Sequence, residues 1–328
     1  MSNQLIASDL SASTCANTAD RCNAQAEEIP STEIVNNWDH EKAWSIFKFL
    51  DVNEETRKDY QYRIGHFLNF ISNKGLNQDS FLEYKKYLKL RTDYTVATKN
   101  KYLITAKVFL KELNRRRLLP VDITQNIKSF SHSKKHKKEG LNDQEIEKLT
   151  FALKELPHNP HNTRIKAIIG LLVLQGLRQI EITRLDVKDI DLIRKTALIE
   201  GKGRDDKEII YLHPETSRHI KRYLKANNLK DGALFVSNSN NSRNIRITTR
   251  GLRMIIRKIL RDLEINKGVH GFRHYFTTTL LKNYQGDLLR VSQYTRHKSL
   301  EMLQVYNDNI EMENDLPKYY KTFKGVKF

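Results

Sequence analysis

A stretch of ten residues without a single apolar side chain divides this chain of 328 residues. It runs Ser131-His-Ser-Lys-Lys-His-Lys-Lys-Glu-Gly140 and contains four lysines. Because such a segment does not enter a packed core, no single core can continue through it. Each flanking part is long enough for a core of its own. We therefore predict two domains, 41–130 and 141–306, joined by a basic linker over 131–140.

The first forty residues differ in composition from the rest. They are rich in Ser, Ala, Asn and Thr and hold one basic and six acidic residues. They lack the basic start and apolar core of a signal peptide. We expect a disordered or weakly ordered leader over 1–40, with a partner-binding arm as the alternative. The cysteines, Cys15 and Cys22, both lie here; two ligands cannot complete a zinc site, and this cysteine usage is typical of a reducing compartment.

The net charge of the chain is +18. Since the leader is acidic, the remainder is more basic still, which favours a polyanionic partner, above all nucleic acid. The longest apolar run, Ala167 to Leu177, contains Gln175 and is too short to span a bilayer. We expect a cytoplasmic, nucleoid-associated protein without a membrane partner.

Apolar residues between 44 and 120 recur at spacings of three and four, which indicates helices with one buried face. We predict a helical bundle over 41–130 in which Thr56 and Thr95 cap two of the helices. The other faces are basic. Candidate DNA-contacting residues are Lys99, Lys101, Arg115 and Arg116 here, and Lys134, Lys135, Lys137 and Lys138 in the linker. The linker lysines have two interpretations: a solvated connection, or a strap that follows DNA phosphates.

The second part mixes helical and strand patterns. We predict helices from Asn142, over 163–175, over 215–225 and over 248–263, and a short strand over 234–236. Two apolar runs around Gly201-Lys-Gly-Arg204 predict a β-hairpin between Leu198 and Leu212, with Lys202 at its tip. The fold class is therefore mainly α with a small antiparallel sheet.

Reactive side chains concentrate in this second part. His270 and Arg273 are three residues apart, so on a helix they share one face. Ser299 with Glu301 indicates the start of a short helix after His297, and Tyr306 follows nine residues after that histidine. Upstream, an apolar run ends in Arg178 and Glu181. Each of these motifs is common by itself.

Taken in order, the motifs resemble the tyrosine recombinases, the phage-integrase and Xer family, over roughly residues 45–310. The residues that carry the resemblance are Arg178, Lys202, His270, Arg273, His297 and Tyr306. One departure stands out: the family usually places Leu-Gly before the second histidine, and this chain has Thr295-Arg296. Because of this departure, the backbone turn before His297 can differ from that of the family. It also makes Arg296 a further candidate for contacting a DNA phosphate.

The resemblance implies a two-domain clamp around DNA, with a helical core-binding (SAM-like) domain and an α-rich catalytic domain. It implies site-specific cleavage and rejoining through a 3′-phosphotyrosyl intermediate on Tyr306, without ATP, metal or another cofactor. Glu181 and His274 would be supporting residues. The implied partner is double-stranded DNA with specific recombination sites. The protein would be a monomer or weak dimer when free and a homotetramer on DNA, with accessory factors as further candidates, and the tail 307–328 would dock on a neighbouring protomer.

Phosphodiester chemistry explains why these residue types suit the reaction. Two guanidiniums, Arg178 and Arg273, can hold the negative charge of a phosphorane while staying protonated. A tyrosine hydroxyl, with a pKa of about 10, needs such cations and a base to become a nucleophile. Lys202 can protonate the departing oxygen. His270 and His297 can exchange protons near neutral pH or hydrogen-bond a phosphate oxygen.

Two rival functions remain at this point. A type IB topoisomerase shares the catalytic residue types but only relaxes DNA; the small helical domain favours the recombinase. A DNA-binding module that keeps the fold without activity is the other rival, and the presence of all six residue types argues against it. Among recombinases, a phage or element integrase, a chromosome-dimer resolvase and a transposon resolvase all stay open.

Overall fold

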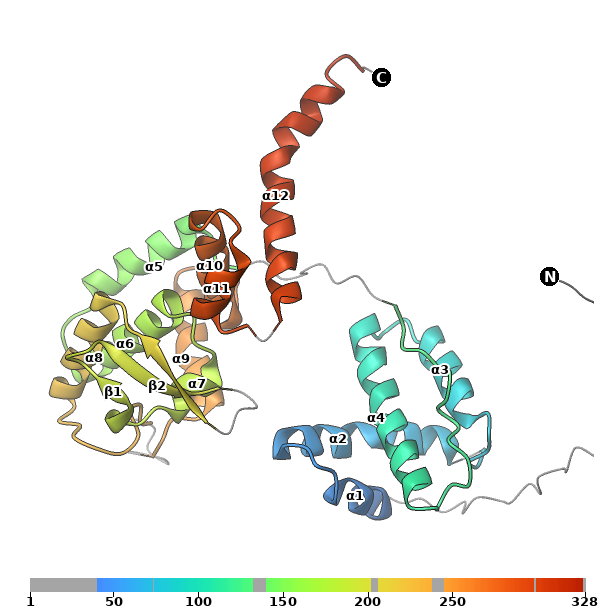
Figure 1. The fold of residues 1–328 in the computed structure, drawn as a ribbon. Helices are drawn as coiled ribbons and strands as arrows, with labels where there is room; N and C mark the ends of the chain where they lie inside the picture. The colour runs from blue at the N-terminus through green and yellow to red at the C-terminus, as the bar shows by residue number, and fades with distance from the viewer. Residues whose placement is uncertain are drawn as a thin grey trace, which may run out of the picture. The chain divides into compact units, whose positions relative to one another are not determined.

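The chain is mainly helical, with one small sheet (Figure 1). The computed structural model describes residues 40–72, 74–131, 140–201, 206–237, 245–297 and 299–326. The chain divides into two compact units, unit 1 ending at Ser131 and unit 2 beginning at His132. The predicted fold class, mainly α with a small antiparallel sheet, is confirmed. Among the described helices none is long and apolar enough to cross a membrane.

The described part of unit 1 is a helical bundle with an aromatic core. It contains α1 (His40–Lys48), α2 (Glu54–Ile71), α3 (Ser80–Leu90) and α4 (Val96–Arg115). The largest fully buried side chains in this core are Phe47, Phe67, Phe81, Tyr84 and Phe109. The predicted cap at Thr95 is confirmed, since its side chain accepts from Thr98 N at 3.2 Å. The cap predicted at Thr56 is wrong: Asn53 caps α2, and Thr56 supplies the N–H that Asn53 accepts at 2.8 Å.

Unit 2 is built around a buried helix, α6. This unit begins with α5 (Asp143–Glu155), which Asn142 caps as predicted, and α6 (Pro160–Leu174). α6 packs against α8 (Pro214–Ala226) and α10 (His270–Asn283), and its buried apolar residues occupy most of its circumference. A helix that is apolar on all sides forms the centre of a domain.

A three-stranded antiparallel sheet follows α6 and the short helix α7 (Gln179–Arg184). After the 3₁₀ turn η1 (Val187–Asp189), the strands β1 (Ile190–Asp191), β2 (Thr196–Glu200) and β3 (Lys207–Tyr211) pair in the order β1-β2-β3. The predicted hairpin is confirmed as β2–β3, with Leu198 opposite Ile209. The strand predicted over 234–236 is wrong, because Ala233 and Val236 form only isolated bridges to Asp186 and Arg246.

Three helices complete unit 2 after α9 (Thr249–Asp262): α10, α11 (Leu288–Thr295) and α12 (Leu300–Thr322). Ser299 caps α12, as predicted, but the helix is long where a short one was expected. Leu303, Tyr306 and Ile310 pack α12 onto α10 and α11. Beyond Ile310 the described side chains of α12 are exposed or, for Leu316, half-buried, and the helix extends away from α10 and α11 (Figure 1). Tyr306 and the predicted tail therefore share one helix.

Candidate active site

Arg178 follows the turn that ends α6. Gly176 makes this turn with a φ of 57°, and a Cβ there would lie 2.3 Å from Cδ1 of Phe276, so both conformation and packing favour glycine. Nη1 of Arg178 donates to Oε1 of Glu181 at 2.7 Å, and its backbone N–H donates to Oε2 at 2.8 Å. The buried carboxylate of Glu181 thus orients the arginine through both its backbone and its side chain.

Arg273 lies on α10 and is only 2% exposed. Its Nη1 donates to the carbonyl oxygen of Gly176 at 2.7 Å, and its Nη2 donates to the carbonyl oxygen of Thr295. Burial, and then the nearby guanidiniums of Arg178 and Arg296, lower the pKa of Arg273 to about 9, so it remains protonated at neutral pH. Like charges gathered in a buried place repel one another, and an anion such as a phosphate would offset that repulsion.

Tyr306 lies on α12 beside the histidines of α10. Its side chain is 5% exposed, and its ring centroid is 5.1 Å from that of His274 and 6.3 Å from that of His297. His274 in turn meets His270 edge-on, at 4.7 Å. Burial raises the pKa of Tyr306 to about 12, although Arg273 acts in the opposite direction. Neutral tyrosine is therefore the form present at neutral pH, and ionising it requires added positive charge or a base.

His297 follows directly after the turn that ends α11. Its Nδ1 lies 2.8 Å from the hydroxyl of Thr295. Burial, then the nearby Arg273, Arg178 and Arg296, lower the pKa of His297 to about 3. The imidazole is therefore neutral at neutral pH, which corrects the expectation that it changes charge there. In this state it is a weak base and adds no charge, but it can hydrogen-bond a phosphate oxygen.

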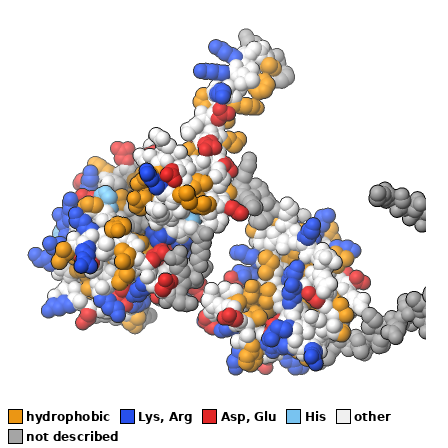
Figure 2. Space-filling view, in the orientation of Figure 1, with side chains coloured by type: hydrophobic (Ala, Val, Ile, Leu, Met, Phe, Trp, Pro, Cys, Tyr) orange, Lys and Arg blue, Asp and Glu red, His pale blue; other side chains and the backbone are white. Residues whose placement is uncertain are grey.

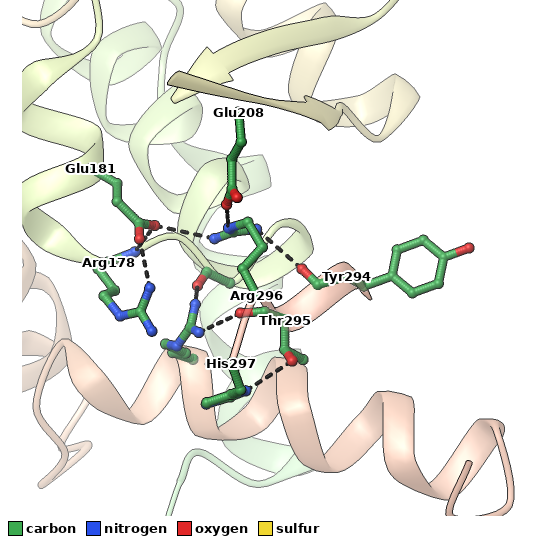
Figure 3. A network of polar contacts seen from close by, with 9 residues as sticks. Arg178, Glu181, Glu208, Tyr294, Thr295, Arg296 and His297 are labelled. Carbon is green, nitrogen blue, oxygen red and sulfur yellow. Dashed lines mark hydrogen bonds and ion pairs between the residues drawn. The ribbon is translucent and has the colours of Figure 1, made fainter. Parts of the chain in front are cut away.

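Arg296 is the residue whose role sequence reasoning did not foresee. It ends α11 in the left-handed conformation, with φ 56° and ψ 40°, which costs an arginine roughly 1 kcal/mol. Its Nη2 donates to Oε2 of Glu181 at 3.1 Å, and its Nε lies 3.2 Å from Oε1 of Glu208 on β3 (Figure 3). Its Nη1 donates to the carbonyl oxygen of Tyr294 at 3.1 Å. These contacts turn the guanidinium towards the protein, so the phosphate contact considered for Arg296 has no support.

The structure thus brings together most of the catalytic residues suggested by the sequence. Arg178, His270, Arg273, His297 and Tyr306 form one cluster in unit 2, with Glu181 and His274 beside them; Arg273 and Tyr306 are buried, Arg178 and His297 are half-buried and His270 is exposed. Lys202, and the linker residues Lys134, Lys135, Lys137 and Lys138, lie outside the described residues. In the part of the chain that the structure describes, no group of three or more His, Cys, Asp or Glu side chains could hold a metal ion.

The DNA-contact candidates of unit 1 have unequal surroundings. Lys101 is exposed, whereas Nζ of Lys99 donates to a backbone carbonyl, that of Lys89, at 3.0 Å. Arg115 and Arg116 both pair with the buried Glu112, at 2.5 and 3.0 Å. Nη2 of Arg116 also donates to the carbonyl oxygen of Ile46 at 2.9 Å, which joins α4 to α1. Arg116 therefore has a structural function that its basic surroundings in the sequence did not reveal.

Comparison with known proteins places this geometry in context. The model of the phage integrase family matches residues 139–313. The tyrosine recombinase XerC of Lactobacillus delbrueckii subsp. bulgaricus is 28% identical over 236 residues, which cover 69% of this chain and 77% of that protein.

Two solved structures are similar in fold. The XerH site-specific recombinase bound to palindromic difH substrate, a post-cleavage complex, is similar with a TM-score of 0.67 and 20% identity, covering 87% of this chain and 86% of that one. The lambda integrase(75-356) dimer bound to a COC′ core site is similar with a TM-score of 0.62 and 12% identity, covering 81% and 93%.

Proposed function

The chain belongs to the phage integrase family, whose model matches more than half of its residues, and we propose that the cluster around the buried Tyr306 is its catalytic site. The protein is a site-specific DNA recombinase, an enzyme that cleaves and rejoins DNA strands. One observation carries the proposal for the site: the buried ring of Tyr306 lies in one cluster with two arginines and three histidines. A core tyrosine with only a packing role would have no need of that charge.

Arg178 and Arg273 bind the scissile phosphate in this proposal. A guanidinium carries planar, paired donors that match phosphate oxygens, and each Nη nitrogen of Arg273 keeps one N–H beyond the bond that it makes to a backbone carbonyl. Glu181 orients Arg178, and two backbone carbonyls orient Arg273. The guanidiniums are thus preorganised where the extra negative charge of the phosphorane develops, which is where electrostatic stabilisation contributes most.

Tyr306 supplies the nucleophile. Its phenolic oxygen forms a bond to phosphorus while the bond from phosphorus to the 5′ oxygen breaks, leaving a 3′-phosphotyrosyl link and a 5′ hydroxyl. The proton of the phenol passes to the imidazole of His270, while His297, whose low pKa makes it a weak base, hydrogen-bonds a phosphate oxygen, and Lys202 protonates the leaving 5′ oxygen. Rejoining reverses these steps on a new 5′ hydroxyl, so the energy of the phosphodiester bond is conserved.

A suicide substrate tests this function. A half-site duplex with a nick just 3′ of the scissile phosphate loses a short strand when it is cut, so the 5′ hydroxyl diffuses away and cannot rejoin. We expect the wild-type protein to accumulate as a covalent protein–DNA complex, visible as a retarded band in a denaturing gel and resistant to chelators. Binding of the substrate without any adduct would leave only a non-catalytic DNA-binding protein.

Double-stranded DNA with specific sites is the proposed substrate. Support comes from the XerH and lambda integrase structures, in which DNA is bound, and from the basic charge of the chain. Phosphate contacts are proposed for Lys99, Lys101, Arg115 and Arg116 and for the linker lysines. The protein would work in the cytoplasm on the nucleoid, assisted by accessory factors.

We also propose a tetramer on DNA, assembled through the end of α12. The apolar residues of this end of the helix and its C-cap recur at helical spacing: Met312, Leu316, Tyr319, Tyr320 and Phe323, of which Leu316 is half-buried and the others are exposed. Acidic residues flank the first half of this stripe and lysines flank the second, as Figure 2 shows along the protruding helix. An isolated helix with such a stripe is stable only when the stripe is covered, which a neighbouring protomer could do.

A pocket of about 820 Å³ between α5, α6, α8 and α10 is the proposed acceptor. Its lining is mainly apolar, with Leu149, Leu153, Ile169 and Val173 among its residues. Its basic residues are Lys154, Lys166, Arg218 and Arg222, which suit the acidic residues Glu311, Glu313 and Asp315 of α12. Apolar and charge complementarity together favour the helix of a second copy.

Deleting the residues after Asp315 should leave binding to one half-site nearly intact but abolish cooperative pairing and recombination. Leu153→Asp, which places a charge in the acceptor pocket, should also abolish cooperative pairing and leave half-site binding nearly intact. Mixing the truncated protein, which keeps its pocket, with the pocket variant, which keeps its helix, should restore paired half-site complexes in a mobility-shift assay. If the tail instead packed on its own protomer, the truncation would lower the melting temperature and the half-site affinity together, and the mixture would restore nothing.

A further inference from the structure

Arg296 combines three features that are unusual in a single residue. It adopts a left-handed backbone conformation, its side chain is only 7% exposed, and two carboxylates from different elements contact its guanidinium. Glycine adopts this conformation without strain, and glycine is the residue that the family usually places here. The ion pairs made by the arginine side chain therefore compensate for its backbone strain.

The contacts of Arg296 link separate parts of the site. Glu181 connects it to Arg178, which donates to the same carboxylate. Glu208 connects it to β3, where Glu208 lies opposite Ile199 of β2. The next residue in the chain is His297. A second ion pair, between Arg184 of α7 and Glu200 of β2 at 2.8 Å, ties the other strand of the hairpin to the same helix that carries Glu181.

We propose that Arg296 is a positioning residue for DNA cleavage, which holds the β2–β3 hairpin and Arg178 in register with His297. It acts through Glu181 and Glu208, since its Nε and both Nη atoms contact protein oxygens. The inference rests on the proposed function, because the residues that it positions are those assigned to catalysis. Hairpin, arginine and histidine come from distant parts of the chain; Arg296 contacts the hairpin at Glu208, directly precedes His297 and reaches Arg178 through Glu181.

Arg296→Gly is the principal test, because glycine keeps the left-handed turn and removes only the side chain. We expect covalent adduct to form on the suicide substrate about a hundredfold more slowly, since small displacements of catalytic groups have effects of that order. Affinity for the half-site should not change. Arg296→Lys should recover part of the rate, because it keeps the charge but not the paired contacts. The matched control is Arg290→Ala. Arg290 is exposed on α11, the helix that ends at Arg296, and the variant should cleave at the wild-type rate.

The pH profile separates positioning from simple loss of folded protein. Glu181 is faced by Arg178 from the turn before α7, by Arg273 from α10 and by Arg296 from the end of α11, with Glu208 beyond Arg296. Burial opposes ionisation of Glu181, but the charge of Arg296 and the hydrogen bonds and charge of Arg178 outweigh it and keep the pKa of Glu181 below the ordinary value. Removing Arg296 takes away a positive neighbour, so the pKa of Glu181 rises. The acidic limb of the cleavage profile should then move to higher pH in Arg296→Gly and stay in place in Arg296→Lys.

Glu208→Gln provides a second variant that disturbs folding less, because its side chain is 25% exposed at the edge of the site. It should slow cleavage without moving the acidic limb. The effects of Glu208→Gln and Arg296→Gly on the cleavage rate should be strongly non-additive in the double variant. Both substitutions break the same contact, the one between Arg296 and Glu208.

Equal cleavage rates in wild type and Arg296→Gly would overturn the inference, as would additive effects of the two substitutions. A weaker affinity of Arg296→Gly for the half-site, with a smaller dependence of the binding constant on salt concentration, would assign Arg296 to phosphate binding. That result would also contradict the proposal. Failure of the proposed function looks different, because the wild-type protein itself would then form no adduct.

Discussion

Tyr306→Phe is expected to bind DNA like the wild-type protein and to form no covalent adduct at all. Phenylalanine keeps the ring that packs against Leu303 and His274, so the fold of α12 and its contacts should survive. The substitution removes only the phenolic oxygen, which forms the bond to phosphorus in the proposed reaction. The measurement is adduct formation on the nicked half-site, beside a mobility shift of the same DNA.

The matched controls are Tyr294→Phe and Tyr284→Phe. These tyrosines are the nearest alternatives in the sequence, and their rings pack against each other at 5.8 Å. Tyr294 is 46% exposed and its ring points away from Arg178 and Arg296 in Figure 3. Both control variants should form adduct at the wild-type rate. Adduct that persists in Tyr306→Phe would move the nucleophile to another residue.

Lys202→Ala is expected to slow cleavage by orders of magnitude on an ordinary substrate, on the order of 10²- to 10⁴-fold, as for loss of a general acid. The 5′ oxygen is a strong base when it leaves, so its departure depends on a proton. A substrate with a 5′-bridging phosphorothiolate has a leaving group that needs none. On that substrate the variant should recover most of the wild-type rate, and equal slowness on both substrates would reject the general-acid role.

Lys207→Ala is the control for damage to the hairpin. Lys207 lies on β3 and pairs with the buried Asp189 at 2.5 Å, so its loss should loosen the strand. A loosened hairpin slows cleavage for reasons unrelated to protonation of the leaving group. We therefore expect any rate loss in Lys207→Ala to be the same on both substrates, in contrast to Lys202→Ala.

Helices and the hairpin were predictable because their signals are local. The side chain of Thr95 accepts an N–H three residues on, and the apolar runs that form β2 and β3 flank a short glycine-containing stretch of the sequence. The wrong predictions arose where the same local sequence pattern fits two different structures. Leu234 and Phe235 are buried like strand residues, but a buried loop with isolated bridges has the same apolar pattern. Ser299 and Glu301 indicated where α12 begins but not its length: the helix continues past Pro317, on an exposed stretch where water can satisfy the backbone.

The catalytic cluster was predictable as a set of residue types in order, but its supporting contacts were not. The contacts of Arg296 with Glu181 and Glu208 join residues far apart in the chain, and no periodicity encodes such pairs. The one available signal was a departure from the family pattern. Arg296 stands where the family usually has glycine, directly after a helix. The neutral state of His297 was hidden for a similar reason, because its low pKa depends on burial and on three arginines that come together only in the fold.

The entry of the chain into unit 2 determines where the protein can be divided. A Cβ on Gly140 would lie 2.7 Å from Cβ of His274, and the N–H of Leu141 donates to the carbonyl oxygen of Gly271 at 3.3 Å. These two residues thus lie against the first turn of the helix that carries His270 and Arg273. A shortened enzyme that starts at Asn142 would keep the capping box of α5. It would lose Gly140 and Leu141, which cover the first turn of α10. Cleavage by a protease, fusion to a second protein or circular permutation should therefore be directed to positions before Gly140, where the break leaves the catalytic helix covered.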